Sequence, residues 1–134
     1  MAAVMMDQGL QDFLTDLIAG SHFSAMKCRL YSNNHTPANT DVLANYTEAT
    51  FSGYSAVTPS GWSGSSVSAH VASSVAADAT FTLTSGSQAI YGVYLTDSAN
   101  SRLYAAQIDP NAPVTLNTTV TTYVVSVTVS LQGP

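Results

Sequence analysis

The side chains best suited to acid–base chemistry in this sequence are a few carboxylates that stand far apart. Hydrolysis of a glycosidic bond needs two carboxyl groups at a fixed separation on either side of that bond. The pairs that could be brought together are Asp41 with Glu48, or Glu48 with Asp97. Nothing else in the sequence singles out either pair, so we do not expect a glycosidase.

The histidines and the cysteine also form no recognisable metal-binding or catalytic motif. His22, His35 and His70 do not form a metal-ligand spacing such as H-x-x-x-H, so capping or surface hydrogen bonding is the simpler interpretation. Cys28 lies on the apolar side of an alternating segment and reads as a small core residue rather than a nucleophile. The chain lacks the G-x-S-x-G, G-x-x-x-x-G-K-[ST] and G-x-G-x-x-G motifs. We therefore predict a protein that is not an enzyme and uses no metal or cofactor.

The composition narrows the choice of partners. Charged residues are only 8% of the 134 residues, and serine and threonine together number 34. With three basic residues and a net charge of −5, the chain cannot neutralise phosphates, so nucleic acid and anionic membranes are not expected partners. No apolar run approaches the ~20 residues of a membrane span. The first residues lack a basic region and are interrupted by Asp7, Asp12 and Asp16, which predicts synthesis in a cytoplasm without a signal peptide. Such a hydroxyl-rich surface suits a subunit of an assembly.

One amphipathic helix is predicted, over residues 1–20. Its apolar residues recur at helical spacing, its opposite face carries aspartates and glutamines, and Gly20 provides a stop. The apolar stripe consists of Met6, Leu10, Phe13, Leu14, Leu17 and Ile18. This helix either packs on the sheet of its own domain or docks into a neighbouring subunit.

The rest of the chain predicts β-strands. From Phe23 the period changes to two, so that Met26, Cys28 and Leu30 face the core while Lys27, Arg29 and Tyr31 face solvent. Further strands are predicted at 67–72, 80–84, 89–95, 103–108 and 119–131, the last as one continuous strand of about 40 Å. The predicted fold is mostly β: an antiparallel β-sandwich, jelly-roll-like, with one N-terminal α-helix. We divide it into an arm at 1–22 and a β-sandwich domain at 23–134.

Residues 30–62 stand out because they combine turn chemistry with aromatic side chains. A long loop in a compact domain is usually functional, or else held down by its own aromatic anchors. Its aromatic residues can be such anchors, part of a protein interface, or a platform for stacking sugars. These residues are Tyr31, Tyr46, Phe51, Tyr54 and Trp62.

The same segment resembles a group of small tailed-bacteriophage virion proteins. The matching motifs are LYSNN at 30–34, Thr36-Pro37, YTEA at 46–49, Phe51, Gly53-Tyr54 and Trp62. The segments YGVY at 91–94 and LYAA at 103–106 are similar to the second half of those proteins. The resemblance covers roughly residues 29–131 and leaves the N-terminal helix outside.

The resemblance implies a structural component of a phage particle, found in the virion after synthesis in the host bacterial cytoplasm. Among such components we favour a capsid decoration (cement) protein that binds the major capsid protein, or another virion protein, on the shell exterior. A tail, neck or fibre component and a carbohydrate- or receptor-binding module are the alternatives. We expect a homo-oligomer, dimer or trimer. The candidate interface residues are Leu10, Phe13, Leu14, Leu17, Tyr31, Tyr46, Phe51, Tyr54 and Trp62.

Overall fold

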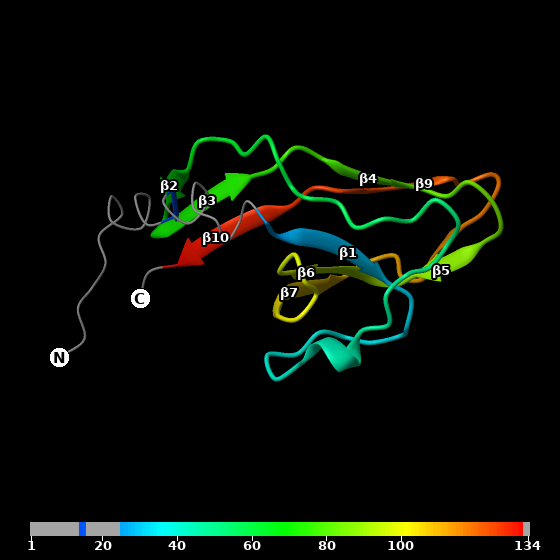
Figure 1. The fold of residues 1–134 in the computed structure, drawn as a ribbon. Helices are drawn as coiled ribbons and strands as arrows, with labels where there is room; N and C mark the ends of the chain where they lie inside the picture. The colour runs from blue at the N-terminus through cyan, green and yellow to red at the C-terminus, as the bar shows by residue number, and fades with distance from the viewer. Residues whose placement is uncertain (1–13, 16–24, 133–134) are drawn as a thin grey trace. The chain divides into compact units, whose positions relative to one another are not determined.

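A computed structural model describes residues 14–15 and 25–132, and this part of the chain is mostly β with antiparallel pairing throughout (Figure 1). Its strands are short and join into sheets of two or three. They are β1 (Lys27–Tyr31), β2 (Ser66–Ser68), β3 (Val71–Val75), β4 (Ala79–Thr82), β5 (Gln88–Ile90), β6 (Gly92–Thr96), β7 (Leu103–Ile108), β8 (Val114–Leu116), β9 (Thr122–Val125) and β10 (Thr128–Gln132). One short 3-10 helix, η1 (Leu43–Asn45), lies between β1 and β2.

The chain divides into two compact units, each built from segments distant in sequence. One unit comprises Met26–Thr58 and Ala79–Val125 and holds the sheet β1-β6-β7 with the pairs β4-β9 and β5-β8. The other includes Pro59–Asp78 and the residues from Ser126 onward, and holds the sheet β10-β3-β2. The predicted boundary between an arm and a β-domain, at residues 22 and 23, lies outside the described residues and stays a prediction.

Most of the predicted N-terminal helix also lies outside the described residues, including Leu10, Phe13 and Leu17. Leu14 and Thr15 are described and are helical. Leu14 is fully buried against Ala72, with the partly buried Val67, Val129 and Leu131 around it. At this position the chain therefore packs on the β10-β3-β2 sheet of its own unit.

The sheet β1-β6-β7 confirms one predicted face of β1 and corrects the other. Met26, Cys28 and Leu30 are fully buried, as their alternation predicts. The prediction that Tyr31 faces solvent is wrong, because Tyr31 is also fully buried. The reason is that a loop, residues 33–47, supplies Tyr46 to cover it, and no periodicity within β1 reports that loop. Burial raises the pKa of the Cys28 thiol to about 12, as expected for a core residue rather than a nucleophile.

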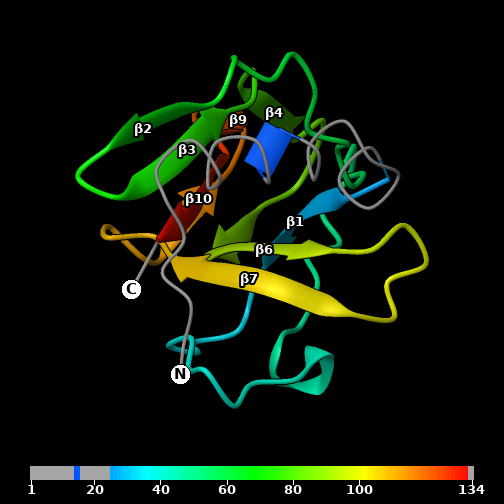
Figure 2. The same ribbon diagram turned by 90° about the vertical axis from the view of Figure 1, so that its left-hand side faces the viewer.

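The single long strand predicted at 119–131 is also wrong. The segment forms two strands, β9 and β10, which pair with β4 and β3 respectively (Figure 2). Val125 pairs with Ala79, and Thr128 pairs with Val75. Three residue steps from Val125 to Thr128 therefore correspond to four residue steps from Ala79 back to Val75. This extra residue interrupts the ladder. The alternation itself is confirmed, since Tyr123, Val125 and Val127 are all buried.

Residues 67–72 form a hairpin rather than the predicted single strand. β2 and β3 pair directly across a turn whose central residues are Ala69 and His70, with φ of 50° and 61°. Two positive φ values define the turn that matches the twist of a two-residue hairpin, and glycine or asparagine normally occupies such positions. Here the two positions are occupied by alanine and histidine, so the sequence carries no signal for this turn.

Replacing Ala69 by glycine should therefore stabilise the protein, by roughly 0.5–1 kcal/mol, because glycine adopts positive φ without steric cost. Urea unfolding followed by circular dichroism measures the change. The matched control is Ala89→Gly, at a half-buried position in the regular pairing of β5 with β8. Glycine weakens a regular strand, so that variant should be destabilised. Equal destabilisation by both substitutions would contradict the strain at residue 69.

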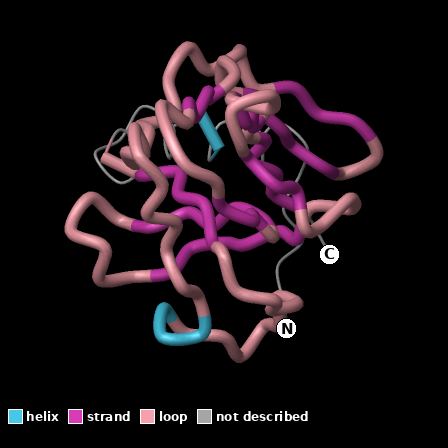
Figure 3. The backbone as a smooth tube through the Cα atoms, turned by 90° about the vertical axis from the view of Figure 1, so that its right-hand side faces the viewer, coloured by secondary structure: helices cyan, strands magenta, loops and turns pink. Residues whose placement is uncertain are grey.

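Loops make up much of the chain between these strands (Figure 3). The strands predicted at 89–95 and 103–108 are confirmed in part: β6 and β7 pair across a polar turn, but β5 separates from β6 at Tyr91 and pairs with β8. In the turn, the Asp97 carboxylate accepts hydrogen bonds from the backbone N–H groups of Ser101 and Arg102 and from the Ser101 hydroxyl. These bonds hold the pKa of Asp97 below its ordinary value.

Candidate functional site

Residues 33–47 form a compact loop that leaves β1 and returns beside it; we call it the braced loop. Asn33 closes it, donating from Nδ2 to the Asn45 carbonyl at 2.8 Å and accepting at Oδ1 from the Thr47 N–H at 2.8 Å. The Ser32 N–H donates to the Thr47 carbonyl at 2.8 Å. Compact surface loops whose ends meet in this way are frequently functional. The braced loop is therefore the first place to look for a site.

Asp41 holds the braced loop together through one oxygen. Its Oδ2 accepts hydrogen bonds from the Ala38 N–H at 2.9 Å and from the Tyr46 hydroxyl at 2.6 Å, and it lies 2.7 Å from His35 Nε2. These bonds, the one from Tyr46 being the strongest influence, lower the pKa of Asp41 to about 2. The carboxylate is therefore ionised at every pH at which the protein is expected to work.

Three tyrosines pack together at the base of the braced loop: Tyr31 of β1, Tyr46 of the loop itself and Tyr94 of β6. The Tyr31 and Tyr46 ring centroids are 5.1 Å apart in an edge-on arrangement, and the Tyr46 and Tyr94 rings are stacked at 5.4 Å. The Tyr31 hydroxyl donates to the His35 carbonyl at 3.2 Å. Burial raises the pKa of Tyr31 and that of Tyr94 to about 12. The rings anchor the braced loop to the sheet β1-β6-β7, which fixes the loop's shape.

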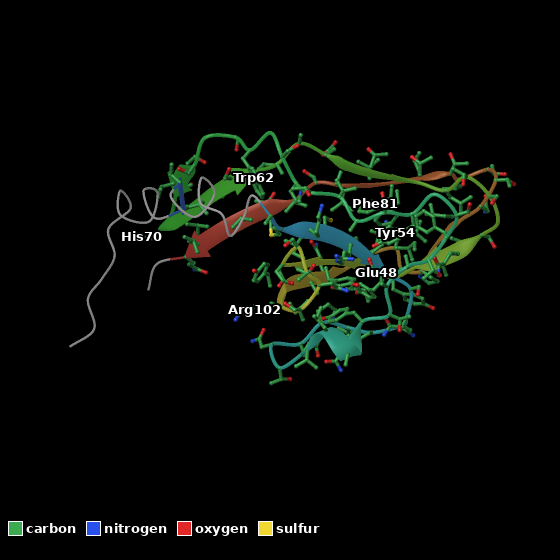
Figure 4. The ribbon with its side chains drawn as sticks, in the orientation of Figure 1. Glu48, Tyr54, Trp62, His70, Phe81 and Arg102 are labelled. Carbon is green, nitrogen blue, oxygen red and sulfur yellow. The ribbon has the colours of Figure 1, made fainter. Side chains whose placement is uncertain are left out.

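A second set of polar contacts fixes the chain just after the braced loop. Arg29 Nη1 lies 2.6 Å from Glu48 Oε1, and the Tyr54 hydroxyl donates to the same oxygen at 2.9 Å. Figure 4 shows Tyr54 between Glu48 and Phe81, whose ring stacks on the Tyr54 ring at a centroid distance of 5.8 Å. Burial is the main cause that raises the pKa of Tyr54. Glu48 thus links β1 to the segment that follows the loop.

Two hollows lie between the braced loop and the edge strand β7. One, of about 590 Å³, is lined by Pro37, Ala38, Asn39 and Asp41 on the loop side and by residues 103–106 of β7. The other, of about 600 Å³, is lined by residues 41–44 and 101–104. Asp41, Leu103 and Tyr104 border both. Two large apolar side chains are exposed here, Val42 at 58% and Tyr104 at 47%.

The predicted interface residues fall into three groups in the structure. Leu10, Phe13 and Leu17 lie outside the described residues, whereas Leu14 is buried within its own unit. Tyr31, Tyr46 and Phe51 are buried in the other unit. Tyr54 is bonded to Glu48, and the half-buried Trp62 belongs to the unit that contains Leu14. The loop aromatics in the Tyr31 unit therefore act as anchors under the loop, which is one of the three interpretations of the sequence.

Of the residues that line the hollows, Tyr46 is among the predicted interface residues. Val42 and Tyr104 are not among them, because neither position carries a sequence signal of exposure. The nearest signal is at β7, where Tyr104 is followed by Ala105 and Ala106 without the alternation of a half-buried strand.

Within residues 14–15 and 25–132 no group of three histidine, cysteine or acidic side chains is placed to hold a metal ion. No helix of that same part is long and apolar enough to cross a membrane. Comparison of the chain with protein-family models, with characterised proteins and with solved structures finds no match.

The anchoring role of Asp41 predicts a pH dependence of stability. Its folded-state pKa of about 2 lies below the value of about 3.9 in an unfolded chain, so its contribution is fully present above pH 4 and is lost as the pH falls toward 2. Asp41→Asn should lower stability at neutral pH and flatten the loss between pH 4 and pH 2. Urea midpoints measured across this range test it, with the exposed Asp78→Asn as control. An unchanged acid profile in Asp41→Asn would contradict the assignment.

Proposed function

We propose that this protein is a structural component of a bacteriophage virion, of the capsid-decoration class, with a jelly-roll-like β-sandwich and an N-terminal helix. It binds the major capsid protein on the outside of the shell and assembles there as a dimer or trimer. The sequence resemblance over residues 29–131 supports the family. The pairing of the charged side chains within the fold supports a surface that packs against another protein.

The main support for the proposal is that few charged side chains in the described part of the chain lack a hydrogen bond or ion pair. Three of the chain's eight acidic residues, Asp7, Asp12 and Asp16, lie outside the described residues, which leaves five acidic and three basic side chains. Six of these eight are hydrogen-bonded or ion-paired within their own unit. They are Lys27 to Thr58, Arg29 to Glu48, Asp41 to Tyr46, Asp97 to Ser101 and Asp109 to Tyr123. Among the charged side chains of the described part, only Asp78 and Arg102 lack such a bond.

A surface with few free charges is weakly hydrated, and electrostatic repulsion between its subunits is small. Lysine and acidic residues are depleted at the centres of protein interfaces, where apolar and aromatic side chains are enriched. Val42 exposes apolar surface on the braced loop, whose shape is already fixed. Because a preformed loop loses little conformational entropy on binding, the braced loop is the contact we assign to the capsid.

Co-sedimentation with undecorated shells of the same phage tests the proposal. Wild-type protein should saturate the shells at a fixed number of copies, and size-exclusion chromatography with light scattering should show a defined oligomer. Val42→Asp should abolish binding, because it places a charge at the centre of the contact. Val124→Asp is the matched control, since Val124 is a valine of similar exposure, 54%, on β9. A folded protein that ignores the shells would instead favour the tail, the neck or a fibre.

A further inference from the structure

The exposure of Tyr104 has a structural cause in the pairing of β6 with β7. Thr96 pairs with Leu103 and Leu95 pairs with Ala105, so Tyr104 is an extra residue opposite no partner. This is a β-bulge, a device that bends a strand and redirects a side chain, often beside a binding site. The redirected Tyr104 borders both hollows, and its side chain has no hydrogen bond or ring contact with the described residues.

Opposite Tyr104, the braced loop offers polar groups that are not used within the fold. Asp41 Oδ1 accepts no hydrogen bond from the described residues, although Oδ2 of the same carboxylate serves three donors. The Asp41 side chain is only 9% exposed, so its free oxygen is held in place at the border of the hollow. The Asn39 side chain lines the same hollow, makes no hydrogen bond to the described residues, and can both donate and accept.

We propose that the hollow between the braced loop and β7 binds a neutral saccharide, with one sugar ring against Tyr104 and its hydroxyl groups bonded to Asp41 and Asn39. A sugar ring has an apolar face of C–H groups, which suits an exposed aromatic ring. Its hydroxyls are donors for the carboxylate and both donors and acceptors for the amide. The hollow, at about 590 Å³, falls within the size range of small-molecule sites.

Two features of the hollow argue against other ligands. An added peptide strand needs a regular row of backbone groups along the edge of β7, and the bulge at Tyr104 interrupts that row. An acidic sugar would bring a second negative charge to the Asp41 carboxylate without a basic residue in the lining of this hollow. Arg102 borders only the second hollow and extends away from the β6–β7 turn (Figure 4). The site therefore selects for uncharged saccharides. This inference goes beyond the proposed capsid binding and does not depend on it.

Nuclear magnetic resonance of the full ¹⁵N-labelled chain tests the proposal. The probes are methyl glycosides of glucose, galactose, mannose, rhamnose and N-acetylglucosamine at millimolar concentrations, with glucuronate as the acidic comparison. At least one neutral glycoside should give saturable shifts of the Asn39, Tyr104 and Ala105 amides, and glucuronate should not. Tyr104→Ala should weaken this binding by about tenfold or more, as expected for loss of a central aromatic contact, whereas Tyr104→Phe retains the ring and should bind.

The results that would overturn the proposal are equally specific. Shifts confined to other regions, or no saturable shift with any of the neutral glycosides, would remove the assigned ligand. Equal binding by Tyr104→Ala and wild type would remove the assigned contact. If capsid shells protect these amides while no glycoside perturbs them, the hollow belongs to a protein interface instead. Folding of each variant is checked by comparing its spectrum with that of Val124→Ala, an exposed substitution on β9.

Discussion

Replacing Gly92 by alanine should destabilise the protein by about 3 kcal/mol or more, the largest effect we expect from adding a single methyl group. A Cβ atom at this position would lie 2.2 Å from the Gln107 carbonyl oxygen and 2.7 Å from the Tyr31 hydroxyl. The first neighbour belongs to the backbone of β7, and the second is fully buried and bonded to the His35 carbonyl. Neither can move away without breaking the sheet or the base of the braced loop.

Thermal and urea unfolding followed by circular dichroism measure this loss. For a chain of this size, about 3 kcal/mol corresponds to a fall in Tm of roughly 10 °C. The matched control is Gly64→Ala, because an added Cβ there meets no atom within 4 Å. That variant should stay within about 0.5 kcal/mol of wild type. Similar stability of the two variants would show that Gly92 is not at a close contact between strands.

Removing the Glu48 carboxylate is the second change with a large expected effect. In Glu48→Ala the Arg29 guanidinium loses its ion pair while remaining mostly buried, at 12% exposure, and the Tyr54 hydroxyl loses its acceptor. Leaving a buried charge without its partner costs about 3–5 kcal/mol in well-buried pairs. Because Glu48 is 29% exposed and water reaches the pair, we expect about 2–3 kcal/mol.

Two further variants separate the contributions in this network. Glu48→Gln keeps an acceptor for Tyr54 but not the charge, so its loss should be smaller than that of Glu48→Ala. Asp78→Ala removes an exposed carboxylate that has no hydrogen bond among the described residues, and it should change stability by less than about 0.5 kcal/mol. If Glu48→Ala is no more harmful than Asp78→Ala, the ion pair does not stabilise the fold. Urea unfolding of the three variants decides this.

Local patterns in the sequence predicted the mostly-β class and several faces correctly. The alternation through Cys28 and Leu30 identified buried positions. The strand predicted at 103–108 is β7, over the same residues. These features depend on neighbours within one strand or one hairpin, and such neighbours are visible in a short window of sequence.

What the sequence did not predict depends on partners far along the chain. The long run at 119–131 alternates without interruption, and only the pairing with Val75 and Ala79 shows where it breaks. Tyr31 looks like an exposed residue until Tyr46 and Tyr94 are placed against it.

The candidate site was located only in part. Residues 30–62 were singled out from the sequence, and the braced loop lies within them. The other wall of the hollows, however, comes from Tyr104 on β7. It is presented by a bulge, and a bulge is defined by register with a second strand rather than by composition.

We propose that this protein decorates the outside of a phage capsid, and labelling of intact virions is the most direct test of that proposal. Antibodies against the purified protein, detected with gold particles in the electron microscope, should mark the whole outer surface of the shell. Shells from virions lacking the protein should be unlabelled and should regain the label when the purified protein is added. Labelling confined to the tail, or no labelling of the virion at all, would contradict the account.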